Sequence, residues 1–349
     1  EEETKVRGDS EGEAPKRTLV GKYELLSGIA PGGMAELHLA RTRSIGGFEK
    51  VVALKRILPH LAESENFVTM FLDEARLAAT LNHPNIAQVF DIGVHNGEFF
   101  FTMEFVPGRD LRYVQRRCKQ LKEPLPLSIA LTILASVAGG LHYAHEKIGP
   151  DGKPLNIIHR DVSPQNVIAT YDGGVKIVDF GVAKAATATE DTKAGILKGK
   201  YSHMSPEQVE GQVLDRRSDV FALGTLMWEL TVGRKLFRGD TLNILESIAR
   251  RPIPTPSSVV PEFPRKLEAI IMKALERKRE KRYQTAQEIQ VAIEDLALDH
   301  RISLSPVALS KFMRRLFDQE AQRWYEAEGE SDERSVRIAS YVTSLSSRE

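Results

Sequence analysis

The chain has 349 residues, of which 42% are hydrophobic and 28% are charged. This composition is typical of a globular protein with one large core or two medium ones, and it excludes a fibrous or wholly disordered chain. Lys and Arg together number 48, as do Asp and Glu, so no net charge attracts the protein to nucleic acid or to an anionic membrane. Cys118 is the single cysteine, which excludes an internal disulfide and favours a reducing, cytoplasmic setting.

Residues 1–18 are rich in charge, Gly and Pro, and we expect them to form a flexible leader. The chain begins at Glu1 without an initiator methionine or a signal-peptide pattern, so we interpret it as a fragment of a longer protein, whose other residues could carry a membrane anchor. The longest apolar run, 125–141, could nearly span a bilayer, but its Ser, Thr and Gly residues favour a buried helix. We expect no membrane contact and no nucleic-acid partner within this segment.

Short β-type runs broken by the turns Gly32-Gly33, Gly46-Gly47 and Asn96-Gly97 follow the leader. Apolar residues at helical spacing between the third and fourth runs predict a helix over 66–81. The expected strands are 23–29, 37–41, 51–57, 87–94 and 99–105. Together these elements predict a small lobe over about 19–106, with a five-stranded sheet and one helix.

The sequence after Gly108 is mainly helical, apart from a short strand pair around Asp172-Gly173-Gly174. The expected helices are 111–119, 127–146, 218–232, 242–249, 265–276 and 286–299. We therefore predict an α+β protein in which a small β lobe precedes a larger helical lobe over about 107–300.

A further helix is expected in an extension over 301–325, where Ser305 caps the start and Pro306 occupies the first turn. Its apolar stripe favours packing on its own domain; the alternative is a docking face for another protein or a second protomer. The stripe consists of Leu309, Phe312, Met313, Leu316 and Phe317. Residues 326–349 are rich in Glu and Ser, and we expect a polar tail.

A glycine pair lies in the turn between the first two expected strands, within IAPGGMAEL at 29–37. An unhindered backbone there could offer its amides to phosphate oxygens, although a plain hairpin explains the turn more simply. Lys55 is the charged residue of the next apolar strand, and it either protects a sheet edge or binds phosphate. Glu74 in the following helix could hold Lys55 in place, which favours the phosphate interpretation.

The segment IIHRDVSPQNV at 157–167 places an acid, an amide and a basic residue between apolar flanks, and Asp179-Phe180-Gly181 follows after one hairpin. This arrangement resembles the HRDxxxxN loop and the DFG motif of eukaryotic-like (Hanks-type) bacterial serine/threonine protein kinases. Landmarks of that family appear in order from Tyr23 to about Leu296. The resemblance implies a two-lobed protein kinase fold for residues 19–300 and transfer of the ATP γ-phosphate to protein Ser and Thr hydroxyls.

By this resemblance, Asp161 orients the substrate hydroxyl and accepts its proton, while Asn166 and Asp179 hold Mg²⁺, with Mn²⁺ as a possible substitute. Lys55, paired with Glu74, contacts the phosphates. Met103 is the expected gatekeeper before the hinge. The expected ATP-binding residues are Ile29, Ala30, Pro31, Gly32, Gly33, Met34, Ala35, Glu36, Leu37, Ala53, Lys55, Met103, Glu104, Val106 and Ile168.

Two further landmarks concern the support of the site. Ser205-Pro206-Glu207 resembles the end of a kinase activation segment, with Arg282 as the expected ion-pair partner of Glu207; the alternative is two surface charges. The SDVFALG segment, 218–224, resembles the helix whose Asp219 anchors the catalytic loop, although in isolation it would be only a capped helix.

The chain departs from the family pattern at four positions. Ala30 and Ala35 replace the first and third glycines of the phosphate loop, and Ser163 replaces a lysine that usually contacts the γ-phosphate. Lys200 stands where the family usually has threonine. We hypothesise that Lys200 supplies the cation that Ser163 cannot; the alternative is a solvent-facing loop lysine.

Arg160 beside Asp161 indicates control by phosphorylation, because an arginine at this position can pair with a phosphate on the activation segment. Thr187, Thr189 and Thr192 are the candidate phosphosites, and a transient homodimer could phosphorylate them in trans. A polar loop without a regulatory role is the alternative.

Two other classes of function stay open. Ser163 and the sparse glycines could indicate a nucleotide-binding pseudokinase scaffold, but Lys55, Asp161, Asn166 and Asp179 are all retained. A small-molecule phosphotransferase would share the catalytic Asp and Asn but should lack the SPE and SDVFALG segments. Signalling through phosphorylation of protein substrates is therefore the leading hypothesis.

Overall fold

The structure is a computed structural model that describes residues 18–31, 35–43, 49–180, 201–328 and 334–346. An antiparallel sheet forms the first lobe, in the order β1-β2-β3-β4-β6-β5. Its strands are β1 (Leu19–Val20), β2 (Tyr23–Pro31), β3 (Ala35–Arg43), β4 (Glu49–Ile57), β5 (Val89–His95) and β6 (Glu98–Glu104). The prediction of five strands was wrong by one, because β1 has only two residues and so offers no alternation to detect.

Two helices accompany this sheet, α1 (Pro59–Ala62) and α2 (Glu65–Ala79). Helix α2 confirms the helix predicted over 66–81, and it packs against β5 and β6. Its buried face includes Phe71, Ala75 and Ala78, but also the carboxylate residue Glu74. A buried Glu on an apolar helix face requires a partner, and Lys55 of β4 supplies it.

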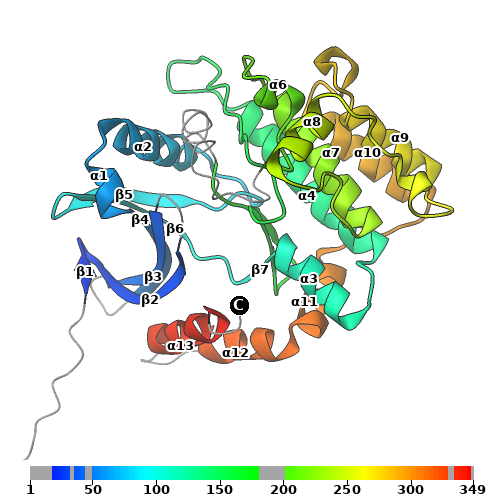
Figure 1. The fold of residues 1–349 in the computed structure, drawn as a ribbon. Helices are drawn as coiled ribbons and strands as arrows, with labels where there is room; N and C mark the ends of the chain where they lie inside the picture. Colours follow the sequence, from blue (N-terminus) through cyan, green and yellow to red (C-terminus); the bar gives the residue numbers. More distant parts are fainter. Residues whose placement is uncertain (1–17, 32–34, 44–48, 181–200, 329–333, 347–349) are drawn as a thin grey trace, which may run out of the picture.

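The second lobe joins a small sheet to a helical body (Figure 1). Its sheet contains β7 (Gly108–Asp110), β8 (Val167–Thr170) and β9 (Val175–Ile177). Its helices are α3 (Leu111–Leu121), α4 (Leu127–His145), α6 (Pro206–Val209), α7 (Arg217–Val232), α8 (Thr241–Ala249), α9 (Arg265–Ala274) and α10 (Ala286–Asp299). The six predicted helices are thus confirmed, and the α+β class with two lobes is confirmed with them.

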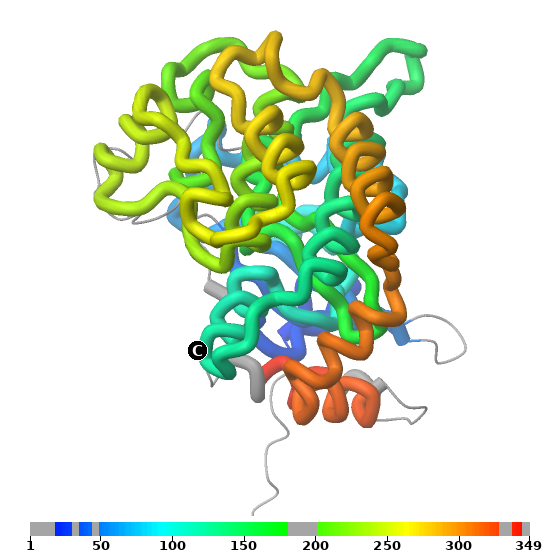
Figure 2. Tube along the Cα trace, turned by 90° about the vertical axis from the view of Figure 1, so that its right-hand side faces the viewer, coloured from blue at the N-terminus to red at the C-terminus, as the bar shows by residue number. Residues whose placement is uncertain are grey.

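Helix α4 is the centre of the second lobe. It is the one helix among the described residues that is long and apolar enough to cross a membrane, but 67% of its most apolar window is buried inside the protein. Helix α10 lies along it (Figure 2), and α7 packs on another side. The helix therefore behaves as the core helix that its Ser, Thr and Gly residues predicted.

Three further helices follow the second lobe: α11 (Pro306–Leu316), α12 (Asp318–Glu328) and α13 (Arg334–Ser346). Ser305 caps α11 as predicted, with its Oγ accepting from the Ala308 N–H, and α11 packs on α4 and β8 of its own chain. The expectation of a polar tail after 326 was wrong. Helix α13 buries Ile338, Tyr341 and Val342, which lie at helical spacing among Ser and Arg residues.

Candidate active site

The catalytic loop between α4 and β8 is anchored by one buried carboxylate. Asp219 of α7 accepts the His159 N–H on Oδ2 and the Arg160 N–H on Oδ1, both at 2.8 Å, and also contacts His145 Nε2 at 2.8 Å. Burial alone would raise the pKa of Asp219, but His145 and the backbone donors outweigh burial, so its pKa lies below the usual range. The charged Asp219 side chain of α7 thus fixes the backbone of the loop at His159 and Arg160.

Arg160 adopts a left-handed backbone conformation, with φ of +67°, which L residues rarely adopt without support. Asp219 holds its N–H, and Gln208 Nε2 of α6 donates to its carbonyl oxygen at 2.8 Å. These two contacts tie the loop to both α6 and α7. The next residue is Asp161, so the strained turn fixes the backbone position from which the predicted catalytic carboxylate extends.

Asp161 and Asn166 lie together in this loop. Asn166 Nδ2 donates to the carbonyl oxygen of Asp161 at 2.9 Å and also to its side-chain Oδ2. Ser163 closes the turn between them, because its carbonyl oxygen accepts the Asn166 N–H at 3.0 Å. Asp161 is partly exposed, as a group that meets a substrate hydroxyl must be.

Lys55 of β4 joins the two lobes. Its Nζ lies 2.9 Å from Glu74 Oε1 of α2 and 3.0 Å from Asp179 Oδ1. Burial alone would lower the pKa of the ammonium, but the charges of Asp179 and Glu74 outweigh burial and hold its pKa above the usual range. Lys55 is therefore a fixed cation, positioned where a nucleotide phosphate would meet the carboxylate that follows β9.

The donor set fits a divalent cation held together with phosphate. Asn166 uses its amide nitrogen on Asp161, so its side-chain oxygen is the atom that could ligate a cation beside Asp179. No group of three His, Cys, Asp or Glu side chains suited to a metal occurs among the described residues. Two protein oxygens with phosphate and water oxygens completing the shell are the arrangement that Mg²⁺ prefers.

The hinge follows β6 and leads directly into β7. Ala53 of β4 is opposite Met103 of β6, and both are buried. The Glu104 N–H already donates to the Gln88 carbonyl at 2.8 Å, so Glu104 can offer a purine only its carbonyl oxygen. On the other side of the hinge, Ile168 of β8 is opposite Asp110 of β7.

Part of the predicted nucleotide site lies in the facing strands β2 and β3. Ile29 lies in β2, whereas Ala35, Glu36 and Leu37 lie in β3, with Leu37 opposite Lys55. Glu36 pairs with Arg56 at 2.9 Å, so its side chain is held on the sheet. Predicted residues beyond the described side chains are Ala30, Pro31, Gly32, Gly33, Met34, Thr187, Thr189, Thr192 and Lys200.

Glu207 and Arg282 form a buried, bidentate ion pair. Arg282 Nη1 and Nη2 donate to Glu207 Oε1 and Oε2 at 2.7 and 2.8 Å. Ser218 Oγ adds a hydrogen bond at 2.8 Å. The pair joins α6 to the loop before α10, so the surface-charge alternative is excluded by the geometry.

Sequence reasoning did not find three supporting residues: His145, Gln208 and Lys176. Lys176 Nζ of β9 pairs with Glu104 of the hinge at 2.9 Å. All three act through contacts between residues distant in sequence, and none lies in a motif that could have shown it.

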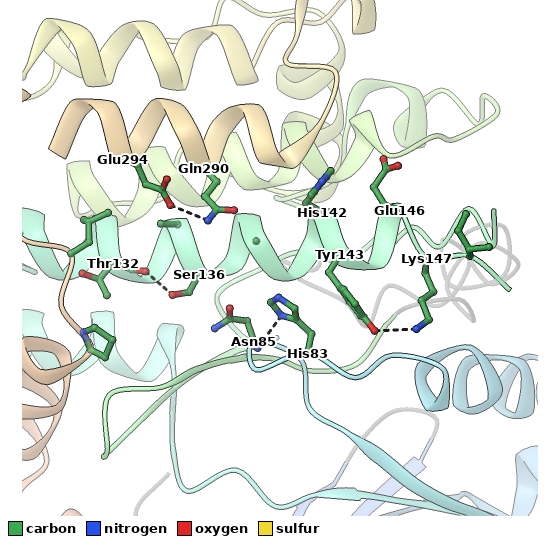
Figure 3. Close-up of a pocket in the computed structure, with 15 residues that line it drawn as sticks. His83, Asn85, Thr132, Ser136, His142, Tyr143, Glu146, Lys147, Gln290 and Glu294 are labelled. Atoms are coloured by element: carbon green, nitrogen blue, oxygen red, sulfur yellow. Dashed lines mark hydrogen bonds between the residues drawn. The ribbon is translucent and has the colours of Figure 1, made fainter. Parts of the chain in front are cut away.

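A separate pocket of about 760 Å³ lies between α4, α10 and the turn at His83 (Figure 3). Tyr143 stacks on His83 there and accepts a hydrogen bond from Lys147 at 3.0 Å. None of the described residues predicted for catalysis or ATP binding lines this pocket. It is therefore distinct from the Lys55 site.

Comparison with known proteins agrees with this geometry. The protein kinase domain family matches residues 23–292, and the chain belongs to that family. The chain is 42% identical to the tyrosine-protein kinase MasK of Myxococcus xanthus, over 86% of this chain and 47% of MasK. It is 35% identical to the serine/threonine-protein kinase PknB of Mycobacterium leprae, over 78% of this chain and 42% of that protein. The chain thus spans about half or less of the length of these relatives.

Solved structures show the same fold. The kinase domain of Mycobacterium tuberculosis PknI matches with a TM-score of 0.61 and 26% identity. The match covers 81% of this chain and 99% of that domain. The protein therefore has the protein kinase fold, and phosphoryl transfer from ATP with a divalent metal is the chemistry of its family.

Proposed function

We propose that this chain is a serine/threonine protein kinase that transfers the γ-phosphate of Mg-ATP to protein hydroxyls. The observation that carries the proposal is the position of Lys55, which contacts Glu74 and Asp179 at once. Protein kinases require both the Lys–Glu pair and the metal-binding Asp in place for catalysis. A scaffold that had lost catalysis would have no need to keep both contacts together with Asp161 and Asn166.

Each charged residue has a distinct part in the proposed reaction. When bound, Mg²⁺ neutralises charge on the phosphates, and Asn166 and Asp179 would hold it. Lys55 would orient the phosphates, because two carboxylates fix its ammonium. Asp161 would align the acceptor hydroxyl and take its proton, as the hydroxyl oxygen attacks phosphorus and ADP leaves.

The acceptor is proposed to be Ser or Thr. Pro164-Gln165-Asn166 resembles the loop of serine/threonine kinases, and PknB and several other relatives carry that name. The relative named a tyrosine kinase makes tyrosine the alternative that the experiment must test.

Ser163 in place of the usual lysine leaves the γ-phosphate short of one cation, and we propose that Lys200 supplies it.

Regulation is proposed to act through Thr187, Thr189 and Thr192, modified in trans within a transient homodimer. Arg160 precedes the catalytic Asp161, where it could pair with such a phosphate. Cys118 is the single cysteine of the sequence, so no internal disulfide can form, which agrees with the proposed action in the reducing cytoplasm. The proposed role is signalling by phosphorylation of protein substrates.

The test is incubation with Mg-ATP, then Mn-ATP, followed by mass spectrometry of every phosphorylated residue. The expected result is phosphothreonine between 187 and 192 in the wild type and none in Asp161→Asn. Phosphotyrosine alone would overturn the acceptor assignment. Absence of phosphate from both proteins, with an added protein substrate also unmodified, would overturn the kinase proposal in favour of a scaffold.

A further inference from the structure

Helices α12 and α13 leave the second lobe and run back beneath the sheet of the first (Figure 1). We call residues 318–328 and 334–346 the C-terminal strap. We propose that the strap positions the nucleotide site by holding β2 and β8 at a fixed separation, with Tyr341 and Glu320 as its positioning residues. The inference rests on the proposed function only in taking the ligand to be an adenine nucleotide.

The strap contacts the first lobe through α13, which packs against β2 and β3. Ile338, Tyr341 and Val342 of α13 belong to the same buried apolar cluster as Leu39 of β3. Ile29 of β2 packs against that cluster, and it is the first residue of the predicted phosphate loop. A shift of α13 would therefore move the strand that leads into this loop.

The strap contacts the second lobe through two polar side chains. Tyr341 Oη lies 2.8 Å from Tyr171 Oη, and Tyr171 immediately follows β8, the strand that carries Ile168. Arg109 of β7 donates from Nε to Glu320 of α12 at 2.8 Å. Because β7 pairs with β8, both contacts fix the same small sheet.

The strap also touches the hinge between the lobes. The ring of Trp324 lies 5.7 Å from that of Phe105 in the hinge and 5.7 Å from that of Tyr341. Phe105 lies between Glu104 and Val106, whose backbones are the expected contacts of adenine. The C-terminal strap thus contacts the β2 side, the β8 side and the hinge of the predicted adenine site.

The polar contacts of the strap are buried, which makes them specific. Arg109, Tyr171, Glu320 and Tyr341 are 8%, 1%, 8% and 3% exposed. Burial raises the pKa of Tyr171 to about 12, and burial also raises the pKa of Tyr341 above its usual value. Both phenols therefore stay protonated at neutral pH, and one of them donates its O–H to the oxygen of the other. A misplaced strap would leave the Tyr171 and Tyr341 hydroxyls and the Glu320 carboxylate buried without these partners, which favours the observed arrangement.

The test compares Tyr341→Phe with Tyr325→Phe. The first change keeps the ring and removes the bond to Tyr171, whereas Tyr325 bonds Arg314 at the surface of the strap. We expect Tyr341→Phe to raise KM for Mg-ATP and Kd for Mg-ADP by about threefold to tenfold. Loss of one buried hydrogen bond should lower, by about that factor, the fraction of molecules whose nucleotide site is correctly arranged for binding. The value of kcat at saturating ATP should stay within about twofold.

Hydrogen exchange supplies a readout that needs neither nucleotide nor activity. In Tyr341→Phe, amides of β2 and β8 should exchange faster, whereas Tyr325→Phe should match the wild type. Glu320→Gln keeps the shape of the side chain but removes its charge, and it should also speed amide exchange in β2 and β8. This variant tests the proposal if Tyr341→Phe does not fold. Unchanged exchange and affinity in both variants would overturn the proposal, as would a raised kcat. A wild type that transfers no phosphate would overturn only the proposed function.

Discussion

Two charge clusters in this molecule have similar partners but differ in their access to solvent. At Lys55, one cation lies between two carboxylates, and the Asp179 side chain is 41% exposed. At Arg282, the guanidinium is fully buried, and Glu207 is 2% exposed. The charges in the first cluster are proposed to meet a metal and phosphates and so need access from solvent, whereas the side chains of Glu207 and Arg282 are closed off from it. Exposure therefore separates the charges proposed for chemistry from those that maintain the fold.

Replacing Lys55 tests the chemical cluster. We expect Lys55→Met to lower kcat/KM for phosphate transfer by about 10³, because a preorganised cation is lost where the phosphates bind. Lys50→Met is the matched control, because Lys50 belongs to the same strand but lies over the ring of Phe90. Steady-state kinetics with a protein substrate measure both. Equal losses in the two variants would contradict a special position for Lys55.

Replacing Arg282 tests the buried cluster. Arg282→Ala leaves the Glu207 carboxylate buried without its partner, which should lower the free energy of unfolding by about 3–5 kcal/mol. Arg251→Ala removes an exposed pair with Glu246 and should cost about 1 kcal/mol or less. Urea denaturation of both variants gives the comparison. A stable Arg282→Ala protein would show that the pair carries little of the fold's stability.

Lys200 extends the comparison to a residue outside the described structure. If it replaces the cation missing at Ser163, Lys200→Met should lower kcat by about 10² to 10³, the effect of one preorganised charge contact. Lys198→Met, two residues earlier, is the matched control. Activity of Lys200→Met within a few-fold of the wild type would leave the missing cation unexplained and overturn the exchange.

Low pH should weaken the Glu207–Arg282 ion pair, because protonation removes the charge of the Glu207 carboxylate. Burial would raise the pKa of Glu207, but Arg282 outweighs burial and holds its pKa below the ordinary 4.5. The folded-state pKa is thus lower than the unfolded one, so the stabilisation is complete above about pH 4.5 and is lost as pH falls through the folded value. Urea midpoints from pH 6 to pH 3 should fall less steeply in Glu207→Gln than in the wild type. Parallel curves would contradict this assignment.

The sequence predicted the site better than it predicted the ends of the domain. Asp161, Asn166 and Asp179 lie in short motifs whose chemistry requires particular residue types, so their grouping can be inferred without coordinates. Glu74 was predicted as the carboxylate, in the helix after the Lys55 strand, that could hold Lys55 in place, and its Oε1 lies 2.9 Å from Lys55 Nζ. Helix α13 was missed because the many Glu and Ser residues of 326–349 favoured a polar tail over the helical spacing of Ile338, Tyr341 and Val342.

Contacts between distant segments could not be inferred where neither residue belongs to a motif pair of the family. Gln208 supports the backbone of Arg160 from another helix, and Tyr341 reaches Tyr171 across 170 residues of chain. Such pairs depend on tertiary packing, which composition and local periodicity do not encode. The sequence thus predicted the residues expected to react and the supporting residues that lie in family motifs, such as Asp219, whereas supporting residues outside those motifs were missed.

The central claim is that Asp161 acts on the substrate hydroxyl within an intact nucleotide site. The most direct test measures phosphate transfer and Mg-ADP affinity on the same samples of wild type and Asp161→Asn. We predict that Asp161→Asn lowers kcat by about 10² to 10⁴, the usual contribution of a general base, while Kd for Mg-ADP changes by less than about twofold. Transfer by Asp161→Asn at the wild-type rate would contradict the account.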